Sequence, residues 1–152
     1  MSLRTRLNDE LKSAMRAKDE RVVGTVRLVL AALKERDIAA RPKGVTAVPD
    51  DDIMQMMNGM IKQRRDSIAL YQQGGRPELA QREQEEIDII QRFLPKQLDD
   101  AAVAEAVKAT IAAVGATTVK DMGKVMAALK ERYAGQMDFS RASGVVKQQL
   151  GS

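Results

Sequence analysis

Cysteine, histidine and tryptophan are all absent from this chain of 152 residues. Without cysteine and histidine, the chain cannot form disulfides, the usual zinc sites, a cysteine nucleophile or a Ser-His couple. The aromatic residues are few: Tyr71, Phe93, Tyr133 and Phe139. An RNA-binding sheet with an aromatic stacking platform is therefore not expected, and any binding to nucleic acid must rest on charge and shape.

Long apolar runs are also missing. The longest are far shorter than the roughly 20 residues that a bilayer-spanning helix needs. The N-terminal sequence Met-Ser-Leu-Arg-Thr-Arg has no apolar block of the kind found in signal peptides. From these absences we expect no membrane contact and a cytoplasmic location.

The charges are unevenly distributed, although the net charge is only +4. Residues 1–41 and 96–152 carry more basic than acidic side chains, whereas residues 42–95 are slightly acidic. A basic end is most often a solvated helix face, and otherwise an anion-binding surface.

The stretch from residue 50 to 94 has the pattern of two amphipathic helices. Apolar residues recur at helical spacing in both halves, first as Ile53, Met57, Met60, Ile68 and Tyr71, then as Leu79, Ile87, Ile90 and Leu94. Between the halves, Gly74 and Gly75 can end a helix and Pro77 suits the start of the next one. The pattern predicts an antiparallel hairpin in which facing residues have numbers that add to about 147.

One level of this pairing brings charges together, since Arg64 falls opposite Glu83. Both side chains could lean outward into water, because long charged side chains reach the surface easily. Alternatively they form an ion pair inside the seam, where a lone charge would be expensive and a pair can set the register. Arg64 and Glu83 are therefore a candidate structural ion pair.

Two further helices are predicted before the hairpin. The first runs from a cap at Ser2 to about residue 18, and its apolar residues follow at strict four-residue spacing: Leu3, Leu7, Leu11 and Met15. The second covers about residues 19–40, and the prolines and glycine of residues 41–49 predict a loop. Three acidic residues follow the loop: Asp50, Asp51 and Asp52. We expect them to cap the next helix. They do not converge on a metal ion, because successive helical side chains point about 100° apart.

Pro95 ends the hairpin and indicates a boundary between an N-terminal domain, residues 1–95, and a C-terminal domain, residues 96–152. The second domain is predicted to hold three short helices, over about residues 100–114, from the capping sequence Thr118-Val-Lys-Asp121, and after Asp138. Gly123 lies inside the second of these, at a cost of roughly 1 kcal/mol relative to alanine. This favours a close neighbouring helix or, less so, a phosphate at the backbone. No strand alternation is found, so the expected fold is all-α.

Several short motifs lie along the hairpin and the C-terminal part. The first group is Lys62-Gln-Arg64-Arg65-Asp-Ser67-Ile68, Gly75-Arg76-Pro-Glu-Leu79, Glu83-Gln-Glu-Glu86-Ile87 and Phe93-Leu94-Pro95-Lys-Gln97-Leu98. The second is Gly115-Ala-Thr, Lys120-Asp121-Met122-Gly123-Lys124-Val125-Met126 and Val145-Val146-Lys147-Gln-Gln-Leu150. In this order they resemble the YqeY-like proteins, which are related to the tail of the GatB subunit of the glutamine-dependent aspartyl/glutamyl-tRNA amidotransferase.

The resemblance implies an all-helical fold with a three-helix C-terminal part. It also implies kinship with a tail that helps to hold tRNA while catalysis proceeds in another domain, and hence an association with carbon–nitrogen ligases that use glutamine as amide donor. The chain has no room for the domain that activates the tRNA-linked carboxylate with ATP, and it shows no P-loop. We therefore expect no catalytic residues, cofactor or metal, and no amidotransferase activity from this chain alone.

Two function classes remain. The chain is either an accessory module of translation that binds tRNA or another structured RNA, or a protein-interaction module that never contacts RNA. The candidate RNA contacts are basic residues at helical spacing: Lys62, Arg65, Lys120, Lys124 and Lys130. A basic stripe would favour RNA, whereas scattered charges around an exposed apolar groove would favour a protein partner.

Overall fold

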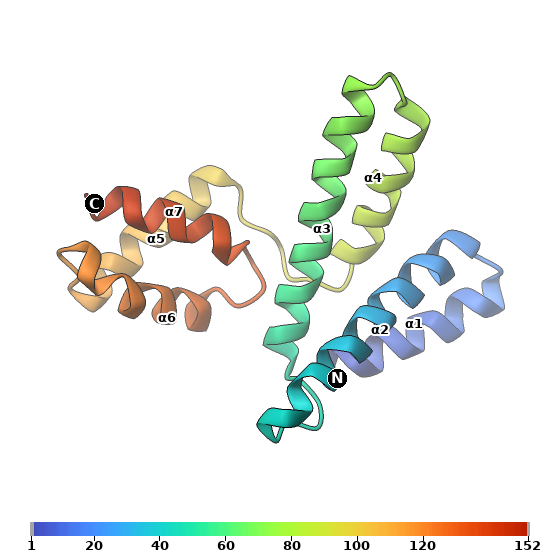
Figure 1. Cartoon of the computed structure of the whole chain (residues 1–152), viewed down its shortest axis with the longest axis horizontal. Helices are drawn as coiled ribbons and strands as arrows, with labels where there is room; N and C mark the ends of the chain where they lie inside the picture. Colours follow the sequence, from blue (N-terminus) through green and yellow to red (C-terminus); the bar gives the residue numbers. More distant parts are fainter. Residues whose placement is uncertain (1, 152) are drawn as a thin grey trace. The chain divides into compact units, whose positions relative to one another are not determined.

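A computed structural model describes residues 2–151, and this part of the chain is all-α, as predicted. It contains seven α-helices and two short 3-10 turns, with no strand between residues 2 and 151 (Figure 1). The chain divides into two compact units, unit 1 over Met1–Leu94 and unit 2 over Pro95–Ser152.

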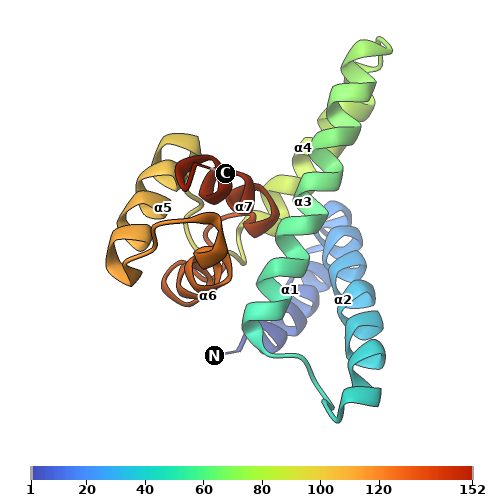
Figure 2. The same cartoon turned by 60° about the vertical axis from the view of Figure 1, so that its left-hand side comes forward.

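Unit 1 is built from two helical hairpins. The elements are α1 (Leu3–Ala17), α2 (Glu20–Ala40), the 3-10 turn η1 (Arg41–Lys43), α3 (Asp50–Gln73) and α4 (Pro77–Gln91). Figures 1 and 2 show α1 beside α2 and α3 beside α4, with the far end of the second hairpin projecting beyond the first. Apolar faces from all four helices form one core, whose fully buried members include Leu7, Val26, Ile53 and Ile90.

The turn of the α3–α4 hairpin follows from its glycines and proline. Gly75 has a φ of +69°, a left-handed conformation that glycine adopts without strain. Because of this reversal the Arg76 N–H donates back to the Tyr71 carbonyl at 2.7 Å. Pro77 then occupies the first turn of α4, where a missing N–H leaves no helical bond unmade.

The predicted apolar stripe of α1 is only partly correct. Leu3 and Leu7 are buried, but Met15 is 50% exposed and Ala14 takes its place in the core. Four residues advance a helix by about 40° more than one full turn, so a strict four-residue spacing drifts around the helix axis. After three steps the stripe has left the face that contacts α2.

Residues 50–52 were expected to cap α3, and this is wrong for the hydrogen bond of the cap. Pro49 is the N-cap of α3, and no side-chain cap hydrogen bond is made there. The Asp50 carboxylate instead accepts from the Leu3 N–H, at 3.3 and 3.4 Å to its two oxygens. It thereby caps the start of α1, while all three aspartates still lie in the first turn of α3 and complement its dipole.

Unit 2 packs three short helices around a core of its own. They are α5 (Asp100–Val114), α6 (Met122–Arg132) and α7 (Phe139–Gln149), with the 3-10 turn η2 (Val119–Asp121) before α6. Val107, Val125, Leu129 and Val146 are fully buried there. The side chains of Asp99 and Asp138 cap α5 and α7 by accepting backbone N–H groups.

The segment that leads into unit 2 is fixed by polar contacts. The Gln97 side-chain amide donates to the Gly135 carbonyl at 2.6 Å and to the Pro95 carbonyl at 2.8 Å. The Leu98 N–H donates to the Gln136 carbonyl at 2.9 Å. Residues 95–98 are therefore held to the loop between α6 and α7.

No single helix between residues 2 and 151 is long and apolar enough to cross a membrane. Taken together, Asp100–Val114 and Val119–Arg132 reach the required length and apolar content, with a bend of 93° between them. The apolar faces of these helices line the core of unit 2, which accounts for their composition.

Candidate nucleic-acid interface

Arg64 lies in the seam between α3 and α4, where its side chain is 13% exposed. Its Nε donates to Oε2 of Glu86 at 2.8 Å, and Oε2 of Glu83 lies at 3.9 Å. Its Nη1 also donates to the Met60 carbonyl at 3.1 Å. One cation thus serves two carboxylates, both 25% exposed, in a partly dehydrated seam.

The structure changes the partner that the sequence predicted for Arg64. Glu83 is within ion-pair distance, but the hydrogen-bonded partner of Arg64 is Glu86, which the register of 147 did not select. Glu83 and Glu86 are three residues apart and therefore neighbours on one face of α4. Two of the motifs named above, the one around Arg64 and the one from Glu83 to Glu86, meet at this contact.

Lys62 and Arg65 lie on α3 on either side of this seam residue, and both are exposed. No ion pair within residues 2–151 involves either of them. Their charges are therefore available to a ligand of unit 1.

The three candidate lysines of unit 2 are also exposed. Lys120 and Lys124 are four residues apart but do not belong to one continuous α-helix, because Lys120 lies in η2 and α6 begins at Met122. Lys130 lies in the last turn of α6, about 240° around the helix axis from Lys124. The lysines therefore surround the start and one flank of α6 rather than form a single stripe.

Asp121 organises the turn η2, which carries Lys120 and leads into α6, where Lys124 lies. Its carboxylate accepts the backbone N–H groups of Thr117 at 2.9 Å and Thr118 at 3.3 Å, within the predicted capping box. These backbone hydrogen bonds, with a smaller contribution from the Lys124 charge, lower the pKa of Asp121 below its usual value. The turn is therefore held by a carboxylate that is ionised near neutral pH.

Gly123 is exposed at the start of α6, and a Cβ atom there would meet no atom within 4 Å. The expected close approach of a neighbouring helix is therefore absent among the described residues. The backbone at this position stays open beside Lys120 and Lys124.

The candidate residues thus form two groups, one on each unit: Lys62 and Arg65 on unit 1, and Lys120, Lys124 and Lys130 on unit 2. Within residues 2–151 no group of acidic side chains is arranged to hold a metal ion.

A bidentate ion pair in unit 1 was missed by sequence reasoning. Arg4 of α1 donates to both carboxylate oxygens of Asp37 on α2, at 2.6 and 2.8 Å, and to the Val48 carbonyl at 3.1 Å. The Val48 N–H donates back to Asp37 at 2.9 Å. The hydrogen bonds from Arg4 and Val48 lower the pKa of Asp37 to about 2. No local pattern could have revealed partners that lie 33 and 11 residues away.

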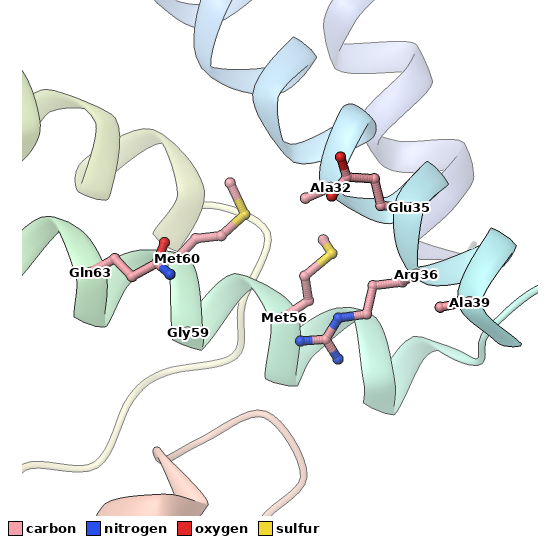
Figure 3. A pocket seen from close by; sticks show the side chains of 8 residues that line it. All are labelled: Ala32, Glu35, Arg36, Ala39, Met56, Gly59, Met60 and Gln63. Atoms are coloured by element: carbon pink, nitrogen blue, oxygen red, sulfur yellow. The ribbon is translucent and has the colours of Figure 1, made fainter.

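An open groove runs between α2 and α3, with a volume of about 460 Å³. Each helix contributes four residues with the same spacing, as Figure 3 shows: Ala32, Glu35, Arg36 and Ala39 from α2, and Met56, Gly59, Met60 and Gln63 from α3. Small residues and two flexible methionine side chains alternate with three polar groups. Such a lining suits an adaptable contact with another macromolecule.

Proteins of known sequence resemble this chain over part of their length. One is the Altered inheritance of mitochondria protein 41, mitochondrial, of Eremothecium gossypii, which is 36% identical over 88 residues. Proteins with the same name from Saccharomyces cerevisiae and Vanderwaltozyma polyspora are 35% and 34% identical over the same length. The matched region covers 58% of this chain and 46% of each relative, so the chain spans about half the length of these curated relatives.

These names correct one expectation. The relatives are called mitochondrial proteins, which contradicts the plain cytoplasmic location inferred from composition. The family itself is shown by a match over nearly the whole chain, since residues 4–150 fit the family model described as Yqey-like protein. The chain therefore belongs to the YqeY-like family.

Proposed function

We propose that this protein is an accessory module that binds tRNA or another structured RNA by charge and shape, and that it has no catalytic activity of its own. The lysines of unit 2 do not form a single stripe, and the observation that carries this proposal is instead their exposure without ion pairs. Lys120 precedes α6, Lys124 lies in its first turn and Lys130 in its last turn, and none of them takes part in an ion pair within residues 2–151. Lysines outside ion pairs suit phosphate groups, because binding then breaks no internal salt bridge.

The open backbone at Gly123 supports the same proposal. A phosphate oxygen can approach the backbone at Gly123 closely, because no Cβ intervenes. The neighbouring N–H groups are already bonded, to the Asp121 carboxylate and to the Val119 carbonyl, so the attraction would come from the lysines. Lys120 and Lys124 would therefore act on the same anion. The resemblance to YqeY-like proteins implies kinship with an amidotransferase tail that helps to hold tRNA, so tRNA is the first RNA to test.

The test measures tRNA affinity by fluorescence anisotropy over a series of salt concentrations. For the wild type we expect contacts with roughly three to five phosphates, each adding about 0.9 to the slope of log affinity against log salt. Changing Lys120 and Lys124 together to Glu should weaken binding and flatten this slope by about two of those contributions. The helical content should stay the same, because both side chains are exposed.

A matched control places the same charge change elsewhere on unit 2, at the exposed Lys108 and Lys147. If this control weakens tRNA binding as much as the Lys120 and Lys124 change does, tRNA responds to the net charge of the protein and not to this site. A separate variant with Lys62 and Arg65 changed to Glu asks whether unit 1 joins the same surface. No tRNA binding by the wild type at low salt would contradict the proposal.

The non-catalytic part has its own test. The pure protein is given misacylated tRNA, ATP and glutamine, and the aminoacyl bond is analysed for amide formation. We expect none, because the chain has no P-loop and neither cysteine nor histidine. Amidated product above the level of a blank reaction would overturn this part.

The groove between α2 and α3 favours a second candidate function, a protein-interaction module. Its methionines and small residues resemble surfaces that accept a partner helix. Gly59→Arg would fill the groove without disturbing the core, since a Cβ at Gly59 meets no atom within 4 Å. A protein partner that the wild type retains and this variant loses, with tRNA affinity unchanged, would favour the second function.

A further inference from the structure

A cavity of about 480 Å³ opens beside α1 and the residues that follow α4, all of them within unit 1. Its lining includes charged side chains of both signs and an aromatic ring: Arg6, Arg16, Arg92, Asp9, Glu10 and Phe93. The members from α1 lie within about 120° of the helix circumference, so they share one side of the helix. Sites that bind small molecules have volumes of roughly 300–1,000 Å³, and this cavity falls in that range.

Arg6 is held in place at the wall of this cavity. Its guanidinium group lies over the Phe93 ring, 5.6 Å from the ring centroid, and its Nη2 donates to the Arg92 carbonyl at 3.1 Å. The ring itself is covered, since Phe93 is 5% exposed, whereas Arg6 is exposed. A flat cation supported on one side by an aromatic ring offers a surface on which a planar ligand stacks. Because Arg6 is already ordered, binding there costs little side-chain entropy.

The other charged groups of the cavity lack ion-pair partners. Neither the arginines Arg16 and Arg92 nor the carboxylates Asp9 and Glu10 take part in an ion pair within residues 2–151. Arginines outside ion pairs bind phosphate or carboxylate groups, often through two hydrogen bonds. Carboxylates accept N–H donors and repel a second anion. A ligand that satisfies both kinds of group carries an anion and an N–H donor in one molecule.

We propose that this cavity binds one unpaired nucleotide whose base carries an amino group. The base stacks on Arg6, and its amino group donates to Asp9 or Glu10. Its phosphate is bound by Arg16 and Arg92. Arg16 lies ten residues after Arg6, or about 15 Å along the helix, and helical side chains lean toward the N-terminus. The Arg16 side chain therefore leans toward the stacked base, which shortens the distance that the sugar and phosphate must span.

A nucleotide fits this lining better than two other anions. Inorganic phosphate would use the arginines but leave the stacking surface and the carboxylates without a role. An acidic peptide would place further carboxylates beside Asp9 and Glu10, which the repulsion between like charges opposes. The site deepens the proposed function and rests on it only for the source of the nucleotide, an unpaired position in a structured RNA.

Titrations of the full chain with mononucleotides, followed by NMR of the isotope-labelled protein, test the site without any RNA. CMP should shift the amide signals around Arg6 and Phe93, with a dissociation constant on the order of 1 mM for so open a cavity. CMP should bind about fivefold more tightly than UMP, because UMP has a carbonyl oxygen in place of the amino group that the carboxylates accept. Equal affinities for CMP and UMP, or for CMP and inorganic phosphate, would overturn the proposal.

Arg6→Lys separates stacking from charge, since lysine keeps the cation but has no flat group. It should weaken CMP binding about fivefold or more, because base stacking is lost, and should leave the affinity for inorganic phosphate unchanged. Arg27→Lys, at an exposed position of α2 outside the cavity, is the matched control and should change neither affinity. An Arg6→Lys protein that binds CMP as tightly as the wild type would contradict the stacking role.

Asp9→Asn and Glu10→Gln in one chain test the carboxylates. This variant should lose most of the preference for CMP over UMP, and it should bind inorganic phosphate more tightly because two negative charges are gone. An unchanged preference for CMP would show that the carboxylates do not read the base.

This proposal and the proposed function can fail separately. Lys120→Glu with Lys124→Glu, which should lower tRNA affinity, should leave CMP binding unchanged. No shift of the unit 1 signals by CMP at about 10 mM would overturn this site without affecting tRNA binding by unit 2. A trinucleotide of cytidine distinguishes the sources of the ligand: tighter binding than CMP would support an RNA chain, and no binding would exclude it.

Discussion

The two units hold their helices together by different means. Among the residues of unit 1 that the structure describes there are three ion-pair sites between helices: Arg4 with Asp37, Arg21 with Glu85, and Arg64 with Glu86 and Glu83. Within the described part of unit 2, the one ion pair is Arg141 with Asp100, whose side chains are 67% and 78% exposed. Unit 2 relies on its apolar core, its helix caps and the hydrogen bonds of Gln97.

Helix length explains this difference. The 24-residue α3 and 21-residue α2 have apolar faces rich in similar residues, which allow neighbouring helices to slide by one turn at little cost. Directional contacts between charged groups discriminate between such registers. The helices of unit 2 have 11 to 15 residues, so fewer registers are open to them. Ion pairs between helices therefore occur in unit 1, where apolar packing alone does not fix how the long helices align.

The largest expected effect tests the apolar side of this comparison. Leu129→Ala removes a fully buried side chain from the core of unit 2 and should reduce the free energy of unfolding by about 3 kcal/mol. Urea unfolding followed by circular dichroism measures the change. Leu70→Ala is the matched control, because Leu70 is 67% exposed and should lose under 0.5 kcal/mol. Similar losses for both variants would show that unit 2 is not held by its core.

A second substitution tests the charged side, at the seam of the α3–α4 hairpin. Arg64→Ala leaves Glu83 and Glu86 facing each other without a cation and should cost about 2–3 kcal/mol. Arg65→Ala, one position along and exposed, should change stability by less than about 0.5 kcal/mol. In double-mutant cycles Arg64 should couple more strongly to Glu86 than to Glu83. The reverse order would favour the register that the sequence predicted.

The seam around Arg64 also shows which features can be predicted from the sequence. The hairpin and its turn follow from local patterns, because periodicity and glycine or proline signals act over a few residues, and they make Arg64 a candidate for an ion pair. The choice between Glu83 and Glu86 does not, since both lie on the same face of α4 and the long Arg64 side chain reaches either. The Arg4–Asp37 pair and the Asp50 contact with Leu3 join residues 33 and 47 positions apart, which no periodicity encodes.

The prediction of the candidate RNA contacts from the sequence was limited in the same way. Their exposure was predictable from the helical pattern, whereas the 3-10 turn that separates Lys120 from α6 was not. A 3-10 turn and an α-helix differ by only about 0.6 residues per turn, which three residues cannot reveal in a sequence.

A smaller effect concerns acid stability in unit 1. The folded pKa of Asp37 is about 2, below its ordinary 3.8. The carboxylate therefore stabilises the fold fully above pH 3.8, and this contribution is lost as the pH falls through about 2. Asp37→Asn should reduce stability near neutral pH by about 1–2 kcal/mol.

Thermal unfolding of both proteins between pH 7 and pH 2 measures this difference. The gap in Tm between wild type and Asp37→Asn should narrow toward pH 2, where about half of the native Asp37 carboxyl groups are protonated. A gap that stays constant across this range would mean that the Arg4 contact contributes nothing through charge.

The smallest expected effect is a gain in stability. Gly123→Ala adds a methyl group in open space within α6 and should stabilise unit 2 by up to about 1 kcal/mol. Thermal unfolding gives the sign, and tRNA affinity of the same variant asks whether a phosphate approaches this backbone. A loss of stability would reveal a close contact at Gly123 and weaken the argument for an open ligand site.

The contact between Asp50 and Leu3 has a consequence for the order of folding. The first turn of α1 is completed by a carboxylate that the ribosome adds 47 residues later. While the chain is being made, α1 and α2 can form a hairpin and Ser2 can cap the Thr5 N–H, but the Leu3 N–H lacks its acceptor until α3 supplies it. Exchange of the Leu3 amide hydrogen with solvent therefore reports the docking of α3 rather than the formation of α1.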